Sequence, residues 1–165
     1  MRSDTCVNPR TGEEHNFYVF DSVNWVNVIA VTPDEKLVLV EQYRHGSNTI
    51  ELEIPGGMMD PHESDPVVTA VRELREETGY EGTHPRELGQ VWSNPAIMSN
   101  TTFTVLIENC ELKHSLEFDS GEDLITRLMP LGEINQLVAN GKIKHSLVVA
   151  ALFHFDLWRR GIKKG

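Results

Sequence analysis

The chain has 165 residues with ordinary charged and apolar content, which predicts a single folded domain over residues 1–165. Its formal net charge of -10 argues against binding to nucleic acid and, more weakly, against binding to an anionic membrane surface. The opening residues MRSDTCVNPR contain no apolar run, and Cys6 and Cys110 lack metal-ligand spacing. We therefore expect a cytoplasmic protein with reduced thiols.

The first third of the chain predicts an arm followed by strands. Residues 1–16 are polar and predict an irregular segment or an N-terminal arm. Short runs of β-branched or alternating residues predict strands at 17–20, 25–32, 36–43 and 49–54. The turn signal Pro33-Asp34-Glu35 lies between the second and third of these runs and predicts a hairpin. Pro55-Gly56-Gly57 ends the last run.

A helix is predicted over about 66–78. Asp65 has the side chain of an N-cap, Pro66 suits the first helical position, and Gly79 provides a C-terminal stop. The residues of its expected buried face recur at helical spacing, and they are Val67, Val71, Leu74 and Thr78.

The second half of the chain adds more strands and closes with helices. Strands are predicted at 86–92, 101–109 and 124–129, and helices at 131–140 and 145–160. A polar, acidic loop occupies 111–123. The apolar part of the last helix is far shorter than the roughly 20 residues that a membrane span needs, so we expect a core helix. Strands followed by covering helices predict an α/β sandwich.

Most of the negative charge is local, because residues 51–81 hold nine acidic residues against two arginines. Glu73, Glu76 and Glu77 crowd one helical face near a C-terminal end, where like charges and the helix dipole both destabilise the helix. A solvated face balanced by Arg72 and Arg75 is one interpretation. The position behind a Gly-Gly turn and beside an acidic strand end favours a site for a divalent cation such as Mg²⁺.

The segment GGMMDPHESDPVVTAVRELREETGY (56–80) resembles the signature of the Nudix hydrolases, usually written G-x5-E-x7-R-E-U-x-E-E-x-G-U, with U a bulky apolar residue. The matching residues are Gly57, Glu63, Arg72, Glu73, Leu74, Glu76, Glu77, Gly79 and Tyr80. Eight residues instead of seven separate Glu63 from Arg72, and we expect the loop at Ser64 or Asp65 to absorb the extra residue. The resemblance implies a Nudix α/β/α sandwich with a mixed β-sheet.

The flanking stretches LVLVEQYRHG, LEIPGG, SNPAIMSN and GKIKHSLVVAALFHF are similar to the ADP-ribose and nucleoside-diphosphate-sugar pyrophosphatases. That branch implies Mg²⁺-dependent hydrolysis of the diphosphate of a small nucleotide sugar, such as ADP-ribose to AMP and ribose 5-phosphate, by a homodimer. A preference for GDP-mannose or another nucleotide sugar stays an alternative. So do an RNA 5′ pyrophosphohydrolase and a non-catalytic module that senses ADP-ribose.

The resemblance also implies roles for the acidic residues. Glu73, Glu76, Glu77 and the carbonyl of Gly56 hold Mg²⁺, for which Mn²⁺ can substitute, and Arg72 keeps the glutamates in place. A general base must take a proton from the attacking water. Glu122 in the acidic loop is the first candidate and Asp119 and Asp123 are close behind. Glu76, within the signature itself, is the alternative.

The expected substrate contacts lie on other segments. Arg44 at a strand end has the planar guanidinium that pairs with phosphate, although a surface salt bridge is the alternative. Trp25 stacks on a nucleobase or else belongs to the core. Glu53 at the acidic strand end and Ser99 after Pro95 complete the predicted contacts.

Overall fold

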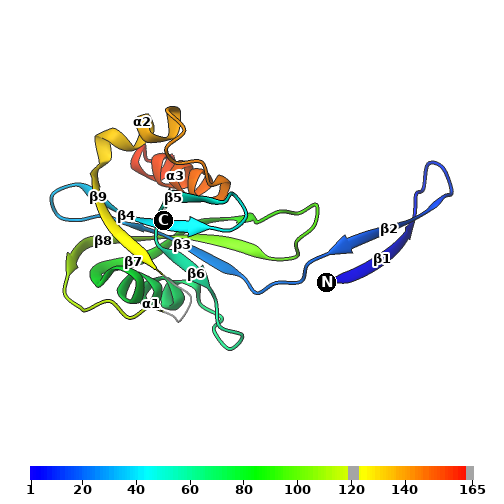
Figure 1. Ribbon diagram of the computed structural model, residues 1–165, viewed down its shortest axis with the longest axis horizontal. Helices are drawn as coiled ribbons and strands as arrows, with labels where there is room; N and C mark the ends of the chain where they lie inside the picture. Colours follow the sequence, from blue (N-terminus) through cyan, green and yellow to red (C-terminus); the bar gives the residue numbers. More distant parts are fainter. Residues whose placement is uncertain (119–122, 163–165) are drawn as a thin grey trace.

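The structure is a computed structural model that describes residues 1–118 and 123–162. Its elements follow one another along the chain as Figure 1 labels them. The strands are β1 (Arg2–Val7), β2 (Glu14–Val19), β3 (Trp25–Ala30), β4 (Lys36–Arg44), β5 (Thr49–Glu53), β6 (Gly56–Met58), β7 (Tyr80–Trp92), β8 (Thr101–Leu112) and β9 (Leu124–Pro130). The helices are α1 (Pro66–Thr78), the short 3-10 helix η1 (Leu131–Glu133), α2 (Ile134–Ala139) and α3 (Ser146–Arg159).

Two sheets form the body of the molecule. One has the strand order β6-β3-β8-β7 and the other has the order β5-β4-β9. The β3–β8 pair is parallel, whereas β3–β6, β7–β8, β4–β5 and β4–β9 are antiparallel. The first sheet is therefore mixed, as the sequence predicted, and α1 and α3 lie on opposite sides of the strands (Figure 1).

Alternation along the strands creates two separate cores. In β8, Val105 and Ile107 face the cluster that contains Leu74 of α1, whereas Leu106 faces the cluster that contains Phe155 of α3. The other strands of the body follow the same rule, since successive side chains of a strand point to opposite faces. Strands covered on both faces carry near-continuous apolar sequence, which is why β3, β4 and β8 are rich in Val, Ile and Leu. The α/β/α sandwich is thereby confirmed.

The predicted hairpin of 25–32 with 36–43 is wrong in its pairing. The turn itself forms, since the Lys36 amide donates to Thr32 Oγ1 at 3.0 Å. The strands then part into different sheets, and a single bridge between Val31 and Leu37 joins them. Both edges of β4 are occupied by β5 and β9, so β4 has no edge left for β3. Pairing in a sheet is set by distant segments, which a local turn signal does not reveal.

The helix at 66–78 is confirmed together with its caps. The Asp65 side chain accepts a hydrogen bond from the Val67 amide at 2.9 Å, and Gly79 takes a left-handed φ of 72°. The predicted buried face is partly wrong, because Val71 is 39% exposed. Thr69 and Ala70 are fully buried instead, since their small side chains let α1 lie close to the sheet.

The N-terminal arm is ordered rather than irregular. β1 and β2 pair as an antiparallel hairpin that forms a sheet of its own, and β2 extends the strand predicted at 17–20 back to Glu14. Figure 1 shows the hairpin reaching away from the body. At the other end, the helix predicted at 131–140 is split into η1 and the short α2. None of the helices in the described part of the chain has the length and apolar character that a membrane crossing requires.

Candidate active site

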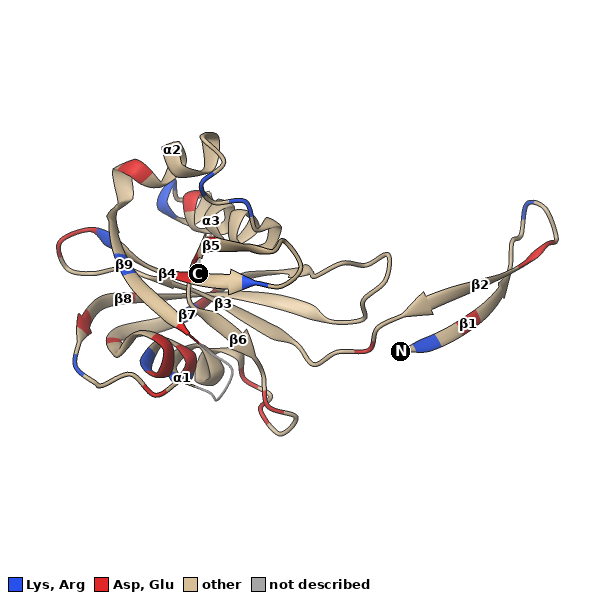
Figure 2. Cartoon of the chain, in the orientation of Figure 1, with Lys and Arg blue, Asp and Glu red and all other residues tan. Residues whose placement is uncertain are grey.

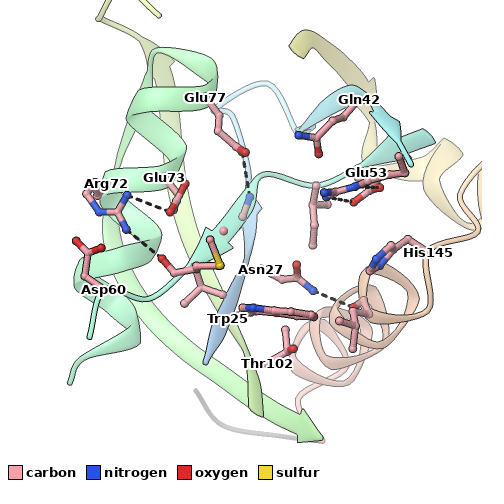
Figure 3. A pocket seen from close by; sticks show the side chains of 17 residues that line it. Trp25, Asn27, Gln42, Glu53, Asp60, Arg72, Glu73, Glu77, Thr102 and His145 are labelled. Atoms are coloured by element: carbon pink, nitrogen blue, oxygen red, sulfur yellow. Dashed lines mark hydrogen bonds and ion pairs between the residues drawn. The ribbon is translucent and has the colours of Figure 1, made fainter. Parts of the chain in front are cut away.

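A pocket of about 470 Å³ opens between the N-terminal end of β3, the ends of β4 and β5, and the helix α1 (Figure 3). Six of the predicted site residues line it, namely Trp25, Arg44, Glu53, Gly56, Glu73 and Glu77. These residues come from β3, β4, β5, β6 and α1, so the fold gathers segments that are far apart in the sequence. Figure 2 shows acidic residues gathered on α1 and the loop before it.

The glycine turn at the start of β6 lies directly against the acidic face of α1. The Gly56 amide donates to Glu77 Oε2 at 3.0 Å. A Cβ atom added at Gly57 would lie 2.5 Å from the Glu73 carboxylate, and one added at Gly56 would lie 2.2 Å from the Val26 carbonyl oxygen. Position 56 therefore needs glycine because it lies against backbone, whereas a side chain at position 57 would displace the Glu73 carboxylate. This contact brings the turn and the two carboxylates into one wall of the pocket.

Arg72 holds the acidic face together from within α1. Its guanidinium lies 3.0 Å from Glu73, 3.0 Å from Glu76 and 3.5 Å from Glu63. It also donates to the Met58 carbonyl at 3.2 Å. Burial alone would lower the pKa of Arg72, but these three carboxylates outweigh burial and raise its pKa above the ordinary value. The arginine thus stays charged and offsets part of the repulsion that the glutamate spacing creates.

Glu63 supports the loop before α1 despite the extra residue in the signature. Its carboxylate accepts from Thr69 Oγ1 at 2.7 Å and from the Asp60 amide at 3.1 Å. The Thr69 hydroxyl, followed by the Asp60 amide and Arg72, lowers the pKa of Glu63 against the opposing effect of burial. Although eight residues separate Glu63 from Arg72, the Glu63 carboxylate still contacts α1 through Thr69 and Arg72.

Arg44 and Glu53 form a bidentate ion pair on the side of the pocket opposite α1. Arg44 Nε and Nη2 each lie 2.9 Å from a Glu53 oxygen. The Glu53 side chain is only 3% exposed, whereas that of Arg44 is 43% exposed. The salt bridge considered for Arg44 is thus present, but it lies in the pocket rather than on the open surface. Such a fork fixes the guanidinium plane toward the cavity.

Trp25 lies along the pocket floor beside Thr102, below Asn27 (Figure 3). It is partly buried, and its indole Nε1 is buried without a hydrogen-bond partner among the described residues. A buried indole nitrogen normally finds a partner. Both interpretations of Trp25 therefore keep support, because the ring contributes to the wall of the pocket and is also half-buried in the body.

Other pocket residues were not found from the sequence. They are Asn27, Gln42, Met58, Asp60, Thr102, His145 and Leu147, together with the apolar neighbours Val26 and Ile54. Two of them carried a usable signal, since Gln42 lies two residues before Arg44 and Asn27 two residues after Trp25, on the same strand faces. His145 precedes α3, where no local pattern marks it. The Asn27 amide donates to the Leu147 carbonyl at 3.0 Å and ties β3 to the start of α3.

The remaining predicted residues are not brought to the pocket wall. Glu76 faces Arg72 and is not among the described residues that line the pocket. Ser99 is exposed at the base of the arm, where its amide donates to the Phe20 carbonyl at 3.2 Å. Glu122 and Asp119 lie outside the described residues, and Asp123 is exposed just before β9. The roles of these residues stay predictions.

The carboxylates of this wall fit a hard divalent cation. Glu73 and Glu77 are 8% and 3% exposed, and burying two negative charges side by side is costly unless a cation is near. Among the described residues no three His, Cys, Asp or Glu side chains form a ready-made metal cage. A site of two carboxylates, completed by backbone, water and phosphate oxygens, matches the way in which Mg²⁺ is usually bound.

Comparisons with known proteins agree with this geometry. The NUDIX domain model matches residues 23–152. The chain is 35% identical over 135 residues to a methanol dehydrogenase activator of Bacillus methanolicus, covering 80% of this chain and 71% of the relative. It is 28% identical to an ADP-ribose pyrophosphatase of Bacillus subtilis, with the same coverage, and 30% identical to the ADP compounds hydrolase NudE of Escherichia coli, covering 78% and 68%. A crystal structure of an ADP compounds hydrolase superposes with a TM-score of 0.81 at 24% identity, covering 98% and 93%.

Proposed function

This chain belongs to the NUDIX domain family, and on that premise we propose that it hydrolyses the diphosphate of nucleoside diphosphate sugars, with ADP-ribose giving AMP and ribose 5-phosphate. It is a hydrolase of pyrophosphate bonds, in keeping with the pyrophosphatases and ADP compounds hydrolase that it resembles. A mouse ADP-sugar pyrophosphatase, 30% identical over 139 residues, points to the same substrate class.

One observation carries the proposal. Two nearly buried carboxylates, Glu73 and Glu77, face the Gly56-Gly57 backbone on one wall, and the Arg44 fork lies on the other side of the same cavity. A diphosphate needs positive charge on both sides because its own negative charge repels an attacking water. An acidic wall paired with a cation meets that need on one side, and a fixed guanidinium meets it on the other.

Members of this family generally need a divalent cation. We propose that this cation is Mg²⁺ and that Mn²⁺ can substitute for it. Glu73, Glu77 and the Gly56 carbonyl hold this cation, and Glu76, which directly precedes Glu77 on α1, contributes as well. When bound, Mg²⁺ neutralises the diphosphate and makes the attacking water more acidic. Arg72 keeps the glutamate oxygens oriented, because it is anchored to the Met58 carbonyl as well as to Glu73 and Glu76.

Other residues bind the substrate and activate the water. Arg44 binds a phosphate oxygen, and its two hydrogen bonds to Glu53 fix the orientation of the guanidinium. Trp25 offers its ring to the nucleobase at the base of the pocket, where the aromatic face stacks on any planar base. Glu122 takes the proton from the attacking water, or else Glu76 does. Ser99, next to the arm, contacts the sugar side of a substrate only if the arm of a second subunit extends the site.

We further propose a cytoplasmic homodimer that acts on small molecules and not on nucleic acid. An isolated two-stranded hairpin is at best marginally stable in water. The β1–β2 arm nevertheless exposes Val7, Phe17 and Tyr18, each more than half exposed, and Phe20 at its base. Such apolar side chains on a projecting arm are expected to pack on a second copy of the chain. The net charge of -10 disfavours a phosphate backbone as substrate.

A substrate panel tests the function directly. The protein is incubated with Mg²⁺ and ADP-ribose, GDP-mannose, other nucleotide sugars, dinucleoside polyphosphates or 5′-triphosphate RNA, and products are resolved by anion-exchange chromatography. The nucleotide sugars should rank first and give a nucleoside monophosphate plus a sugar phosphate. Preferred cleavage of RNA, or tight binding of ADP-ribose without turnover, would replace the proposal with an RNA-directed enzyme or a sensing module.

A further inference from the structure

A second cavity of about 430 Å³ lies beside the active-site pocket. It is lined by the end of β4 and the following turn (Arg44, His45, Gly46, Ser47), by Glu51 of β5, and by Lys144 and His145 ahead of α3. Arg44 and His145 line both cavities, so the two are adjacent along these side chains. An additional group on a molecule that is bound beside Arg44 and His145 would lie at the second cavity.

The charge of this second cavity is opposite to that of the α1 wall. Two permanent cations, Arg44 and Lys144, and two imidazoles, His45 and His145, face a single carboxylate, that of Glu51. The α1 side of the active-site pocket instead presents Asp60, Glu73 and Glu77 against one arginine. In a chain with a net charge of -10, a cavity in which basic groups outnumber acidic ones is unusual and favours an anionic occupant.

Glu51 is the single acidic residue that lines the second cavity. Its carboxylate accepts from Thr49 Oγ1, and the hydroxyls of Thr49 and then Ser47 lower the pKa of Glu51, with further help from Lys144 and His145. The carboxylate therefore stays ionised and has a hydroxyl donor within its own turn. Arg44 keeps its fork on Glu53, which lies on the active-site side, and Lys144 and the two imidazoles are left as the groups that distinguish the second cavity.

His145, at the start of α3, adds an imidazole at the boundary between the cavities. His145 occupies the N-cap position of the 14-residue helix α3 but makes no side-chain capping hydrogen bond in the described part of the chain. Its Nδ1 is buried and has no hydrogen-bond partner among the described residues. Figure 3 shows the imidazole pointing into the pocket. A buried ring nitrogen of this kind calls for a ligand or water as its partner.

We propose that the second cavity binds a phosphomonoester carried by the substrate itself, in addition to the diphosphate that is cleaved. A phosphomonoester dianion is opposite in charge to the lysine and can accept hydrogen bonds from the lysine and from imidazole N–H groups. The preferred substrates are then nucleotide sugars with an extra phosphate on one of their riboses. This inference rests on the proposed function for the position of the diphosphate, but the anion site itself does not depend on turnover.

Matched substrates give the kinetic test. ADP-ribose is compared with ADP-ribose 2′-phosphate and with ADP-ribose 1″-phosphate, which carry the extra group at opposite ends. We expect one of the two phosphorylated compounds to be hydrolysed with a kcat/KM about tenfold above that of ADP-ribose. Lys144→Gln should remove that preference, because it deletes the flexible cation of the cavity. Lys142→Gln is the control, since Lys142 is exposed on the same segment and lines neither cavity.

A metal-free binding measurement separates this inference from the proposed function. With EDTA present, calorimetry should show the preferred phosphorylated compound binding about tenfold more tightly than ADP-ribose, and Lys144→Gln should abolish the difference. That result would support the anion site even if no nucleotide sugar were hydrolysed. Equal affinities for all three compounds, or a preference that Lys144→Gln and Lys142→Gln reduce alike, would overturn it.

A third arm distinguishes the source of the phosphate. If the cavity serves the substrate, inorganic phosphate should inhibit hydrolysis of the phosphorylated compound competitively and affect ADP-ribose much less. An increase in the rate of ADP-ribose hydrolysis by inorganic phosphate, with no preference for either phosphorylated compound, would show an effector site instead and would contradict the proposal.

Discussion

The Gly56 amide and the Glu77 carboxylate, 21 residues apart in sequence, are joined by a hydrogen bond of 3.0 Å. This contact closes the loop of 57–65 against α1 and fixes the last turn of the helix beside the glycine backbone. Glu77, which also lines the pocket, is therefore held in place by a backbone donor. Carboxylates positioned in this way need little rearrangement when a cation binds.

Glu77→Gln should lower Mg²⁺-dependent kcat/KM by at least about a hundredfold, because it removes the ligand charge while the amide oxygen still accepts from Gly56. The thermal midpoint should change little. Glu87→Gln, on an exposed residue of β7, makes the same chemical change away from the pocket and should leave the kinetics alone. Near-normal turnover by Glu77→Gln at ordinary Mg²⁺ concentrations would refute the assigned metal site.

Gly57→Ala should reduce activity without unfolding the protein. The new Cβ would lie 2.5 Å from the Glu73 carboxylate, the far end of a flexible side chain, so Glu73 can move at small cost. We expect a change of less than about 1 kcal/mol in the free energy of unfolding, with a clear loss of kcat. Gly132→Ala is the matched control, because no described atom lies within 4 Å of its added Cβ. Equal kinetics of the two variants would disprove the steric argument.

Arg44→Lys should raise KM for ADP-ribose, because lysine cannot form the planar fork. The free energy of unfolding should change little, because lysine keeps the positive charge beside Glu53. Arg44→Ala should in addition destabilise the fold by about 1–3 kcal/mol, because the nearly buried Glu53 loses its bidentate partner. Chemical denaturation and steady-state kinetics on both variants give the two readouts. Unchanged kinetics in Arg44→Lys would mean that Arg44 acts only through its ion pair with Glu53.

The loop before α1 should be sensitive to acid. The folded protein lowers the pKa of Glu63, chiefly through Thr69, below the ordinary value of 4.5. A lowered carboxyl pKa stabilises the fold above pH 4.5 and loses this contribution as pH falls through the lower folded value. Urea midpoints between pH 7 and pH 3 should therefore fall less steeply for Glu63→Gln than for the wild-type protein. An equal slope in both proteins would show that Glu63 does not contribute.

The arm should control assembly and not the stability of the body. Replacing Phe17 and Tyr18 together by serine removes two exposed apolar side chains without touching either core. Sedimentation equilibrium should show a dimer for the wild-type chain and a monomer for the double variant, with the same thermal midpoint at low concentration. A monomeric wild-type chain at micromolar concentration would rule out the proposed homodimer.

Local sequence signals predicted the features of α1 that depend on neighbouring residues. The caps Asp65 and Gly79 set the ends of α1, and helical spacing placed Glu73 and Glu77 on one face. The face that is buried was less certain, because Val71 and Ala70 are neighbours and only contact with the sheet decides between them. Residues brought in by long-range pairing had no such signal. His145, for instance, reaches the pocket only because α3 packs on the opposite side from α1.

The two cores have a consequence for how this site can change over time. Leu74 of the α1 cluster supports the acidic wall, whereas Val148 and Phe155 of the α3 cluster support the segment with Lys144 and His145. Substitutions that repack one cluster need not disturb the other, since the strands separate them. Repacking of the α3 cluster is thus expected to alter the proposed phosphate cavity while the acidic wall keeps its shape.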